Sequence, residues 1–197
     1  ENGNQEESLK IYEKLGDKVI DINDPCYNNY LTIIGNAIVN SNEKQIEFLL
    51  SNFKNIDLNK LDIKYNRNAL HYICMKDSAN QEIDFKKYEK WIKLGTSLTQ
   101  KDIFNRNPLF YLFINENNQT KKEDPISTLS YLLDSYDELN KNNKDLDLNS
   151  VDILGNPLIF YAVKSDAVFC VSSLMNRGAK IKDIKNYENN SILSYAL

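Results

Sequence analysis

The residues of this chain best suited to catalysis or metal binding are its one histidine and its three cysteines. His71 and Cys74 would lie on one face of a helix, three residues apart, where both could touch a metal ion. Zinc takes about four such ligands, and the other two cysteines, Cys26 and Cys170, lie far away in the sequence. His71 is the only histidine, and no nucleophile motif accompanies it, as a catalytic triad would require. We therefore expect these residues to be structural and expect no metal site.

Other signatures of ligand chemistry are incomplete. Residues 145–149 (Asp-Leu-Asp-Leu-Asn) resemble the start of a calcium loop. The glycine and the glutamate that this loop needs are replaced by Ser150 and Asn156, so the match fails. The chain has only 6 glycines and no glycine-rich phosphate-binding motif. The sequence thus predicts no catalytic residue, no cofactor and no enzymatic activity.

Composition narrows the class of partner. The net charge is −4, whereas a nucleic-acid binder is expected to be basic, so we expect no nucleic acid. No apolar run approaches the roughly 20 residues of a membrane-spanning helix, and the polar, acidic start (residues 1–7) is unlike a signal peptide. An odd number of cysteines favours a reducing compartment, cytoplasmic or nuclear. The abundance of Asn, Lys, Ile and Tyr is typical of an AT-rich genome, such as that of a protist.

A short phrase recurs along the chain and points to internal repeats. It combines a turn-forming residue, an apolar core and an aligned tyrosine, and it occurs at residues 66–72, 105–111 and 155–161, with a looser copy at 189–195. A second phrase keeps the same order, at 21–23 (Asp-Ile-Asn), 57–59 (Asp-Leu-Asn) and 147–149 (Asp-Leu-Asn), with a degenerate copy at 180–182. Two phrases in one register indicate a repeat of about 33 residues with insertions.

Each repeat is expected to contain a short helix followed by a longer one. The short apolar helices are predicted at 70–75, 109–114 and 159–164, and the longer amphipathic ones at 43–53, 85–94, 126–139 and 166–175. Ile46, Leu49, Leu50 and Phe53 follow the spacing of a single helical face. Gly178 is placed to end the last helix in the left-handed conformation.

These phrases resemble the ankyrin-repeat pattern, in which a D-x-x-G-x-T-P-L-H-x-A opening precedes a helix pair. Residues 152–162 give the best copy, 102–109 the second, and 69–71 keep the Leu-His pair without the proline. Asn replaces the turn glycine three times, but it tolerates the left-handed region. The resemblance implies an all-α solenoid of stacked helix-turn-helix units with projecting hairpin turns, and it implies that His71 braces the turn of its own repeat.

The resemblance also implies the domain organisation. A single domain is expected over residues 1–197, with approximate repeats at 8–23 (partial), 24–59, 60–98, 99–148, 149–182 and 183–197 (partial). The repeat at 99–148 carries two polar insertions, 115–124 and 137–145, which we expect to be surface loops. The partial repeats at both ends suggest a piece of a longer protein, because a solenoid needs polar caps.

Arrays of this family grip proteins with their hairpin tips and first helices, so the resemblance implies a partner surface. Tyr65, Phe104 and Leu154 would form an apolar ladder at the tips, flanked by Arg67 and Arg106, and aromatic and Arg residues are enriched at binding hot spots. The alternative is that neighbouring tips pack together and bury this ladder. The full set of expected partner-binding residues is Lys64, Tyr65, Arg67, Ile103, Phe104, Arg106, Ile153, Leu154 and Asn156, with Met75, Lys76 and Lys164 at the ends of the first helices.

Three functions remain open at this level. The first is a non-catalytic scaffold, monomeric by preference, that binds a protein partner through its concave face. The second is the recognition arm of a larger enzyme, such as a kinase, ubiquitin ligase or ADP-ribosyltransferase. The third is a tetratricopeptide array, whose repeats lack projecting hairpins, unlike the turns that Asn105 and Gly155 mark here.

Overall fold

The chain folds into short helices joined by ordered turns. The computed structural model describes residues 21–25, 29–76, 90–114, 125–140, 145–182 and 184–195. Within these ranges the elements are α2 (Ile33–Val39), α3 (Glu43–Asn52), α4 (Ala69–Lys76), η1 (Pro108–Leu112), α6 (Ile126–Leu139), α7 (Leu158–Lys164), α8 (Val168–Asn176) and η2 (Ile192–Tyr195). The same ranges contain isolated β-bridges but no strand. The prediction of an all-α fold is confirmed.

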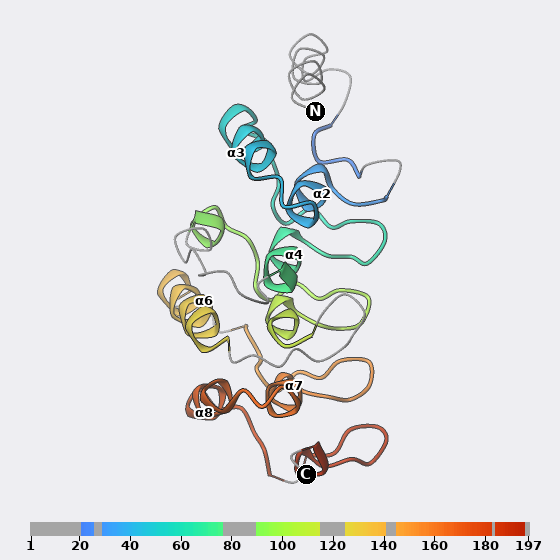
Figure 1. The fold of residues 1–197 in the computed structure, drawn as a ribbon, viewed down its shortest axis with the longest axis vertical. Coiled ribbons are helices and arrows are strands. Elements are labelled where there is room, and N and C mark those ends of the chain that lie inside the picture. The colour runs from blue at the N-terminus through green and yellow to red at the C-terminus, as the bar shows by residue number, and fades with distance from the viewer. Residues whose placement is uncertain are drawn as a thin grey trace.

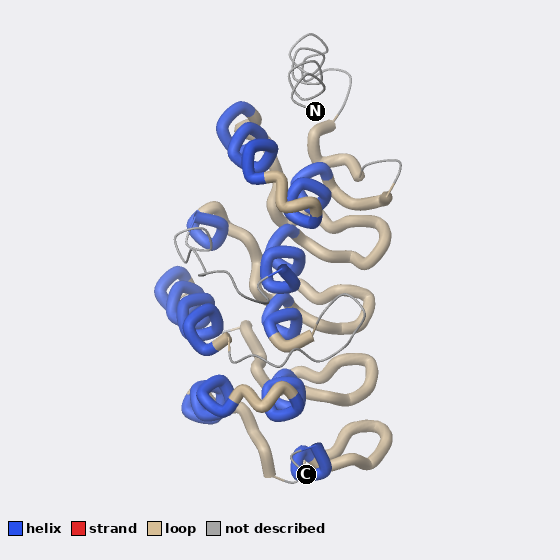
Figure 2. The backbone as a smooth tube through the Cα atoms, in the orientation of Figure 1, coloured by secondary structure: helices blue, strands red, loops and turns tan. Residues whose placement is uncertain are grey.

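The helices stand in two columns, as Figures 1 and 2 show. An inner column contains α2, α4, η1, α7 and η2, and an outer column contains α3, a helical turn at 90–93, α6 and α8. Long turns project sideways from the inner column, on the side opposite the outer helices. Contacts run both along and across the columns, because α4 packs on α2 and η1, while α7 packs on α8.

Helix ends follow local sequence rules. Asn42 caps α3 by accepting a hydrogen bond from the backbone N–H of Gln45 (3.1 Å), and Thr32 caps α2 in the same way through Gly35 (3.1 Å). Gly178 follows α8 with φ 93°, as expected. Its N–H and that of Ala179 reach back to the carbonyls of Met175 and Leu174, which stops the helix.

The structure corrects several predicted boundaries. The helix expected at 109–114 is a 3-10 helix over Pro108–Leu112. Of the helix expected at 85–94, residues 90–93 are helical, and 85–89 lie outside the described residues. The insertion expected to begin at 137 begins later, because α6 runs to Leu139. The insertion at 115–124 and the partial repeat at 8–20 also lie outside the described residues.

The core lies between the two columns. It takes Leu70, Leu109 and Ile159 from the inner column and Leu129, Leu132 and Cys170 from the outer one, all with almost no exposed surface. Trp91 is buried, and so are the aligned tyrosines Tyr72, Tyr111 and Tyr161. None of the described helices is long and apolar enough to cross a membrane.

The Asp-x-Asn phrases hold successive units at a fixed spacing. In each phrase the Asn backbone N–H donates to the Asp carboxylate two residues earlier, at 2.8–2.9 Å. The Asn side chain then bridges to the next unit by both of its polar atoms. Asn59 donates from Nδ2 to the carbonyl of Gly95 (2.7 Å) and accepts at Oδ1 from the N–H of Ser97 (2.6 Å). Asn23 and Asn149 make equivalent pairs of bonds. The phrase recurs because each copy makes the same bridge.

Candidate functional site on the tip turns

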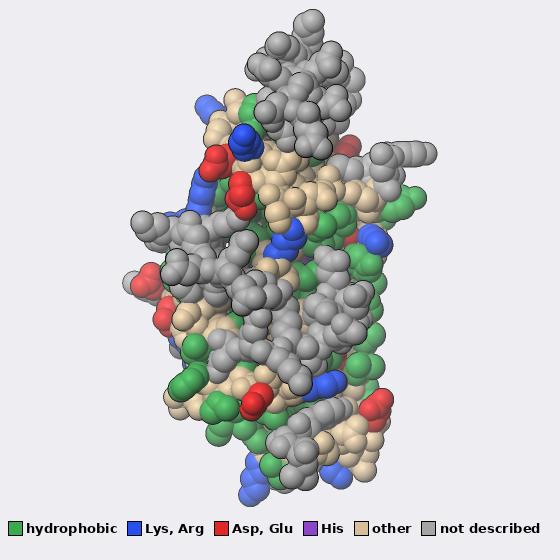
Figure 3. Space-filling view, viewed as in Figure 1, with side chains coloured by type: hydrophobic (Ala, Val, Ile, Leu, Met, Phe, Trp, Pro, Cys, Tyr) green, Lys and Arg blue, Asp and Glu red, His purple; other side chains and the backbone are tan. Residues whose placement is uncertain are grey.

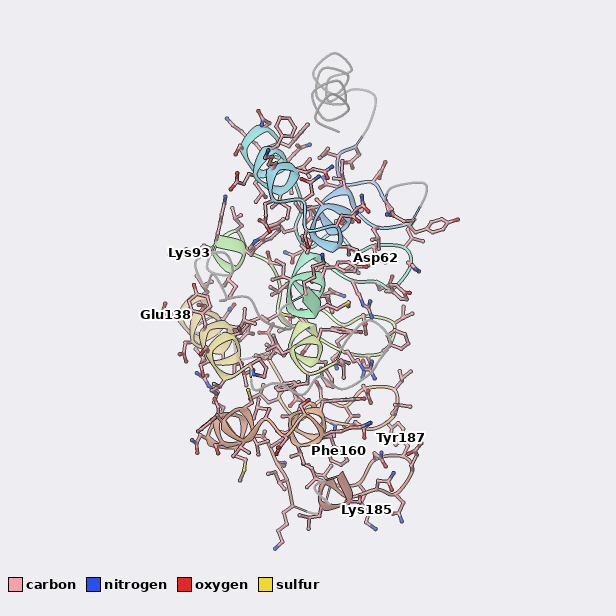
Figure 4. All side chains as sticks on the ribbon, in the orientation of Figure 1. Asp62, Lys93, Glu138, Phe160, Lys185 and Tyr187 are labelled. Carbon is pink, nitrogen blue, oxygen red and sulfur yellow. The ribbon has the colours of Figure 1, made fainter. Side chains whose placement is uncertain are left out.

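Among the turns that project from the inner column, four are described in full, and we call them the tip turns: residues 62–67, 102–106, 152–156 and 186–190. Figure 4 labels Asp62 in the first and Tyr187 in the last. Each begins with Asp or Asn, whose side chain accepts hydrogen bonds from backbone N–H groups inside the same turn. Each also contains a residue with positive φ: Asn66, Asn105, Gly155 or Asn189. Asn therefore replaces Gly in the left-handed conformation, as expected.

Buried charges link neighbouring tip turns. Arg67 donates from Nε to Oδ2 of Asp102 (3.1 Å) and from Nη2 to the hydroxyl of Tyr111 (2.6 Å), while Tyr111 itself donates to Asp102. One turn further on, Arg106 donates to Oδ2 of Asp152 from Nε (3.0 Å) and Nη2 (2.8 Å). Tyr161 completes the second cluster by donating to Asp152 at 2.6 Å. Each arginine thus joins its own turn to the next turn.

The tyrosines of these clusters stay protonated at neutral pH. Burial raises the pKa of Tyr161 to about 12, and the hydrogen bond to Asp152 adds to this effect. Tyr72 makes the equivalent bond in the first tip turn, donating to Oδ2 of Asp62 at 2.8 Å, and burial likewise raises the pKa of Tyr72 and of Tyr111. Each hydroxyl keeps its proton and donates a hydrogen bond to an aspartate carboxylate.

The charged links end before the last tip turn. The position equivalent to Arg106 is occupied by Asn156, and the position equivalent to Asp152 by Asn186. Asn186 donates from Nδ2 to Oδ1 of Asn156 at 3.0 Å, so a neutral amide pair replaces the ion pair. Charge-assisted hydrogen bonds are about twice as strong as neutral ones.

His71 of α4 connects the end of the first tip turn to the second tip turn. Its Nε2 lies 3.1 Å from the carbonyl oxygen of Arg106, and its Nδ1 lies 3.2 Å from the backbone N of Asn68. Nδ1 also lies 2.7 Å from Oδ1 of Asn68, so both ring nitrogens have hydrogen-bonding partners inside the fold. Complete burial lowers the pKa of His71 to about 4. His71 is a neutral structural group, which braces its own turn as expected and also holds the following one.

Backbone hydrogen bonds fix the register of the tips. In each tip turn, the residue after the opening Asp or Asn donates its backbone N–H to a carbonyl of the preceding turn. These bonds are Ile63 to Tyr30 (3.0 Å), Ile103 to Tyr65 (2.9 Å), Ile153 to Phe104 (3.1 Å) and Tyr187 to Leu154 (3.1 Å). Together with the buried links, these bonds leave little freedom for one tip to move against the next.

The outer surface of the tips carries an apolar row. Ile63, Ile103, Ile153 and Leu154 are 66%, 49%, 52% and 47% exposed, and we call these four residues the tip row. Hydrophobic side chains lie along the edge of the molecule where the tips project (Figure 3). Beside them, the rings of Tyr65 and Phe104 are half-buried, with centroids 6.4 Å apart. Of the expected ladder, Tyr65 and Phe104 are thus partly buried by packing between neighbouring tips, whereas Leu154 is exposed.

The predicted site residues separate into exposed and buried sets. Lys64, Ile103, Ile153, Leu154, Lys76 and Lys164 are exposed, with Nζ of Lys76 donating to Oγ of Ser41 at 2.5 Å. Arg67 and Arg106 were expected to flank the ladder at the surface, but both are buried because they pair with Asp102 and Asp152. Asn156 is buried by its bond to Asn186, and Met75 packs in the core. For these four residues, the expectation of a surface position is corrected.

Ile63 belongs to the tip row although it is absent from the expected set of partner-binding residues. The turn at 62–67 is one residue longer than the next, so counting back from Asn66 aligned Lys64 with Ile103. The backbone bonds show that Ile63 is the true equivalent. The recurring Asp-Ile pair at 62–63, 102–103 and 152–153 would have revealed it.

The part of the chain that the structure describes contains no group of three or more His, Cys, Asp or Glu side chains placed to hold a metal ion. His71 uses both ring nitrogens within the fold, and Cys74 is buried beside it on α4. A scan of protein-family models finds none that matches this chain, and no curated protein is significantly similar to it.

Proposed function

We propose that this chain is a non-catalytic scaffold of the ankyrin-repeat type, which binds a protein partner through its tip turns. Three observations support the repeat type: helix pairs stack in two columns, turns project from one side, and both sequence phrases make equivalent contacts in successive units. Projecting turns favour this type over a tetratricopeptide array, whose repeats lack them.

The tip row is the observation on which the proposed function rests. A contiguous exposed apolar surface usually marks an interaction site. The row takes one residue from each of the first two tip turns and two from the third, so a partner would span several units. Isoleucine and leucine offer no donor or acceptor in their side chains, so the partner must present apolar side chains here.

Rigidity supports the same function. A surface that is already ordered before binding loses little conformational entropy when the partner arrives. The tips have this property because their buried Arg–Asp pairs and their backbone bonds join each turn to the next. In this proposal the buried Arg–Asp pairs hold the tip row in position and take no part in a reaction.

We test this function by replacing the row and leaving the network intact. A peptide-display selection on the wild-type chain should yield binders with apolar side chains. The triple variant Ile63→Ser, Ile103→Ser, Ile153→Ser should lose at least about tenfold in affinity for them, since truncating a hot-spot residue costs about 2 kcal/mol or more. Its melting temperature should stay close to that of the wild type.

A matched control places the same kind of change elsewhere. Lys44→Ser, Glu47→Ser, Lys54→Ser alters three exposed residues in or just after α3 and should leave binding unchanged. The proposed function is wrong if the triple isoleucine variant binds the selected peptides as tightly as the wild type does.

A further inference from the structure

A second exposed apolar surface lies on the outer column, away from the tips. Val168, Phe169 and Met175 of α8 are 60%, 69% and 49% exposed, and Leu139 at the end of α6 is exposed as well. Val168, Ser172 and Met175 follow the i, i+4, i+7 spacing of one helical face, and Ser172 is also exposed. Hydrophobic side chains gather over this end of the outer column in Figure 3. We call Val168, Phe169, Met175 and Leu139 the α8 surface. They belong to the outer column, which lies on the side of the molecule opposite the projecting turns (Figure 1).

Carboxylates surround the α8 surface. Asp134 and Asp137 of α6 are 65% and 55% exposed, and both pair with Arg177 just beyond α8. Glu138 is exposed next to Leu139 and points outward from α6 (Figure 4). Asp166 is exposed at the other end, two residues before Val168. Four carboxylates thus stand against one arginine, and the α8 surface has an acidic rim.

The charge of the rim indicates which kind of partner could bind the α8 surface. An anionic membrane would be repelled by this rim, as would an acidic peptide. A helix with an apolar stripe and lysine or arginine on its flanks fits both the apolar side chains and the acidic rim of the α8 surface. Its stripe would cover the apolar side chains, and its cations would meet the carboxylates. Basic side chains also cover apolar area with their aliphatic stems.

We propose that the α8 surface binds a basic amphipathic helix of a protein partner, at a site separate from the tip row. The helix lies along α8 and covers Val168, Phe169 and Met175. Its cations meet Glu138 and Asp166, which make no ion pair with the described residues. The acidic rim steers the approach, and the apolar contact supplies most of the affinity.

Two synthetic amphipathic peptides with the same leucine stripe test this proposal. One has lysines on its polar face and the other has glutamates. Fluorescence anisotropy should show the lysine peptide binding at least about tenfold more tightly, with an affinity that falls as salt rises. The double variant Val168→Ser, Phe169→Ser should lose about tenfold in affinity for it. Glu138→Gln, Asp166→Asn should lose about threefold and flatten the salt dependence.

The substituted side chains are exposed, so circular dichroism melts should match the wild type and separate a binding defect from misfolding. The triple tip-row variant should bind the lysine peptide normally, which distinguishes this site from the proposed function. Equal binding of the two peptides, or binding that Phe169→Ser leaves unchanged, overturns the proposal. It is also overturned if light scattering shows a wild-type dimer that Phe169→Ser dissociates, because a second copy of the chain would then be the occupant.

Discussion

At the scale of single residues, the polar side chains of this protein act mainly on one another. Arg67 and Arg106 would stand out on a sequence reading as surface recognition groups, but their guanidinium groups lie inside the fold. There they meet carboxylates and tyrosine hydroxyls at hydrogen-bonding distance. Removing one partner from such a buried pair leaves an uncompensated charge, which costs far more than the pair itself contributes.

Arg106→Met should therefore lower the free energy of unfolding by roughly 3–5 kcal/mol. The loss arises because Asp152 would remain buried without a cation. Urea denaturation at pH 7 measures it. Arg177→Met is the matched control, since it removes a partly exposed arginine whose partners Asp134 and Asp137 are exposed, and it should cost only about 0–1 kcal/mol. Similar losses in the two variants would contradict a structural role for the buried pair.

His71 should make the fold sensitive to acid. Its pKa is lowered from 6.5 to about 4 in the folded chain, so between these values the unfolded state binds a proton that the folded state does not. Stability therefore rises with pH across this window and is lost as pH falls through it, by about 3 kcal/mol in all. Below about pH 4 this contribution no longer changes.

Two measurements check the effect of His71. Because the chain has one histidine, its imidazole proton signals in an NMR titration report His71 alone and should move with a midpoint near pH 4. In urea denaturation, His71→Gln should be less stable at pH 7 but should show a weaker decline toward pH 4. A midpoint near 6.5 in the folded protein would show that the ring is solvated.

At the scale of elements, the tip turns depend on residues that tolerate positive φ. Asn66, Asn105 and Asn189 supply this conformation with a side chain, and Gly155 supplies it without one. The space at Gly155 is already taken, because an added Cβ would lie 2.7 Å from the ring of Tyr187 and 2.8 Å from its backbone N. Two tip turns thus pack together at a position where only hydrogen fits.

Gly155→Ala should therefore destabilise the fold more than Gly178→Ala does. Both residues have positive φ, at 78° and 93°, and an alanine there costs about 1–2 kcal/mol. At Gly178 nothing lies within 4 Å of the added Cβ, whereas at Gly155 the last tip turn must also move. Thermal denaturation of the two variants compares the costs directly, and equal losses would show that Tyr187 adjusts freely.

At the scale of the whole molecule, stability should vary along the stack. Each unit contacts mainly its neighbours, so the strength of each link decides which unit opens first. Ion pairs join the tip turns at 62–67, 102–106 and 152–156, and a neutral amide pair joins the last one. Of the three links between successive tip turns, the neutral one to the last turn is the weakest.

Hydrogen exchange measures this gradient. The backbone N–H groups of Asp102, Asp152 and Asn186 make equivalent bonds across their own turns, each 3.0 Å long. We expect the Asn186 N–H to exchange faster than the other two, because its turn opens without breaking a buried ion pair. Equal protection at the three positions would mean that the tips open as one unit.

The sequence by itself determined that the chain is helical and approximately where most helices and turns of the described residues lie. These features are local, since α6 at 126–139 follows from apolar periodicity and the left-handed turns follow from Asn and Gly at recurring positions. The bracing role of His71 came with the ankyrin resemblance, whereas its bond to the following tip turn appeared only in the structure.

Only the tertiary structure decided which tip residues face solvent. Arg67 meets Asp102 across 35 residues and Arg106 meets Asp152 across 46, and no local pattern reveals such a contact. Once these pairs form, the arginines become buried and the isoleucines beside them remain outside. The proposed recognition surface is therefore the tip row, which keeps Leu154 of the expected ladder but not its flanking arginines, because these charged groups have their partners within the fold.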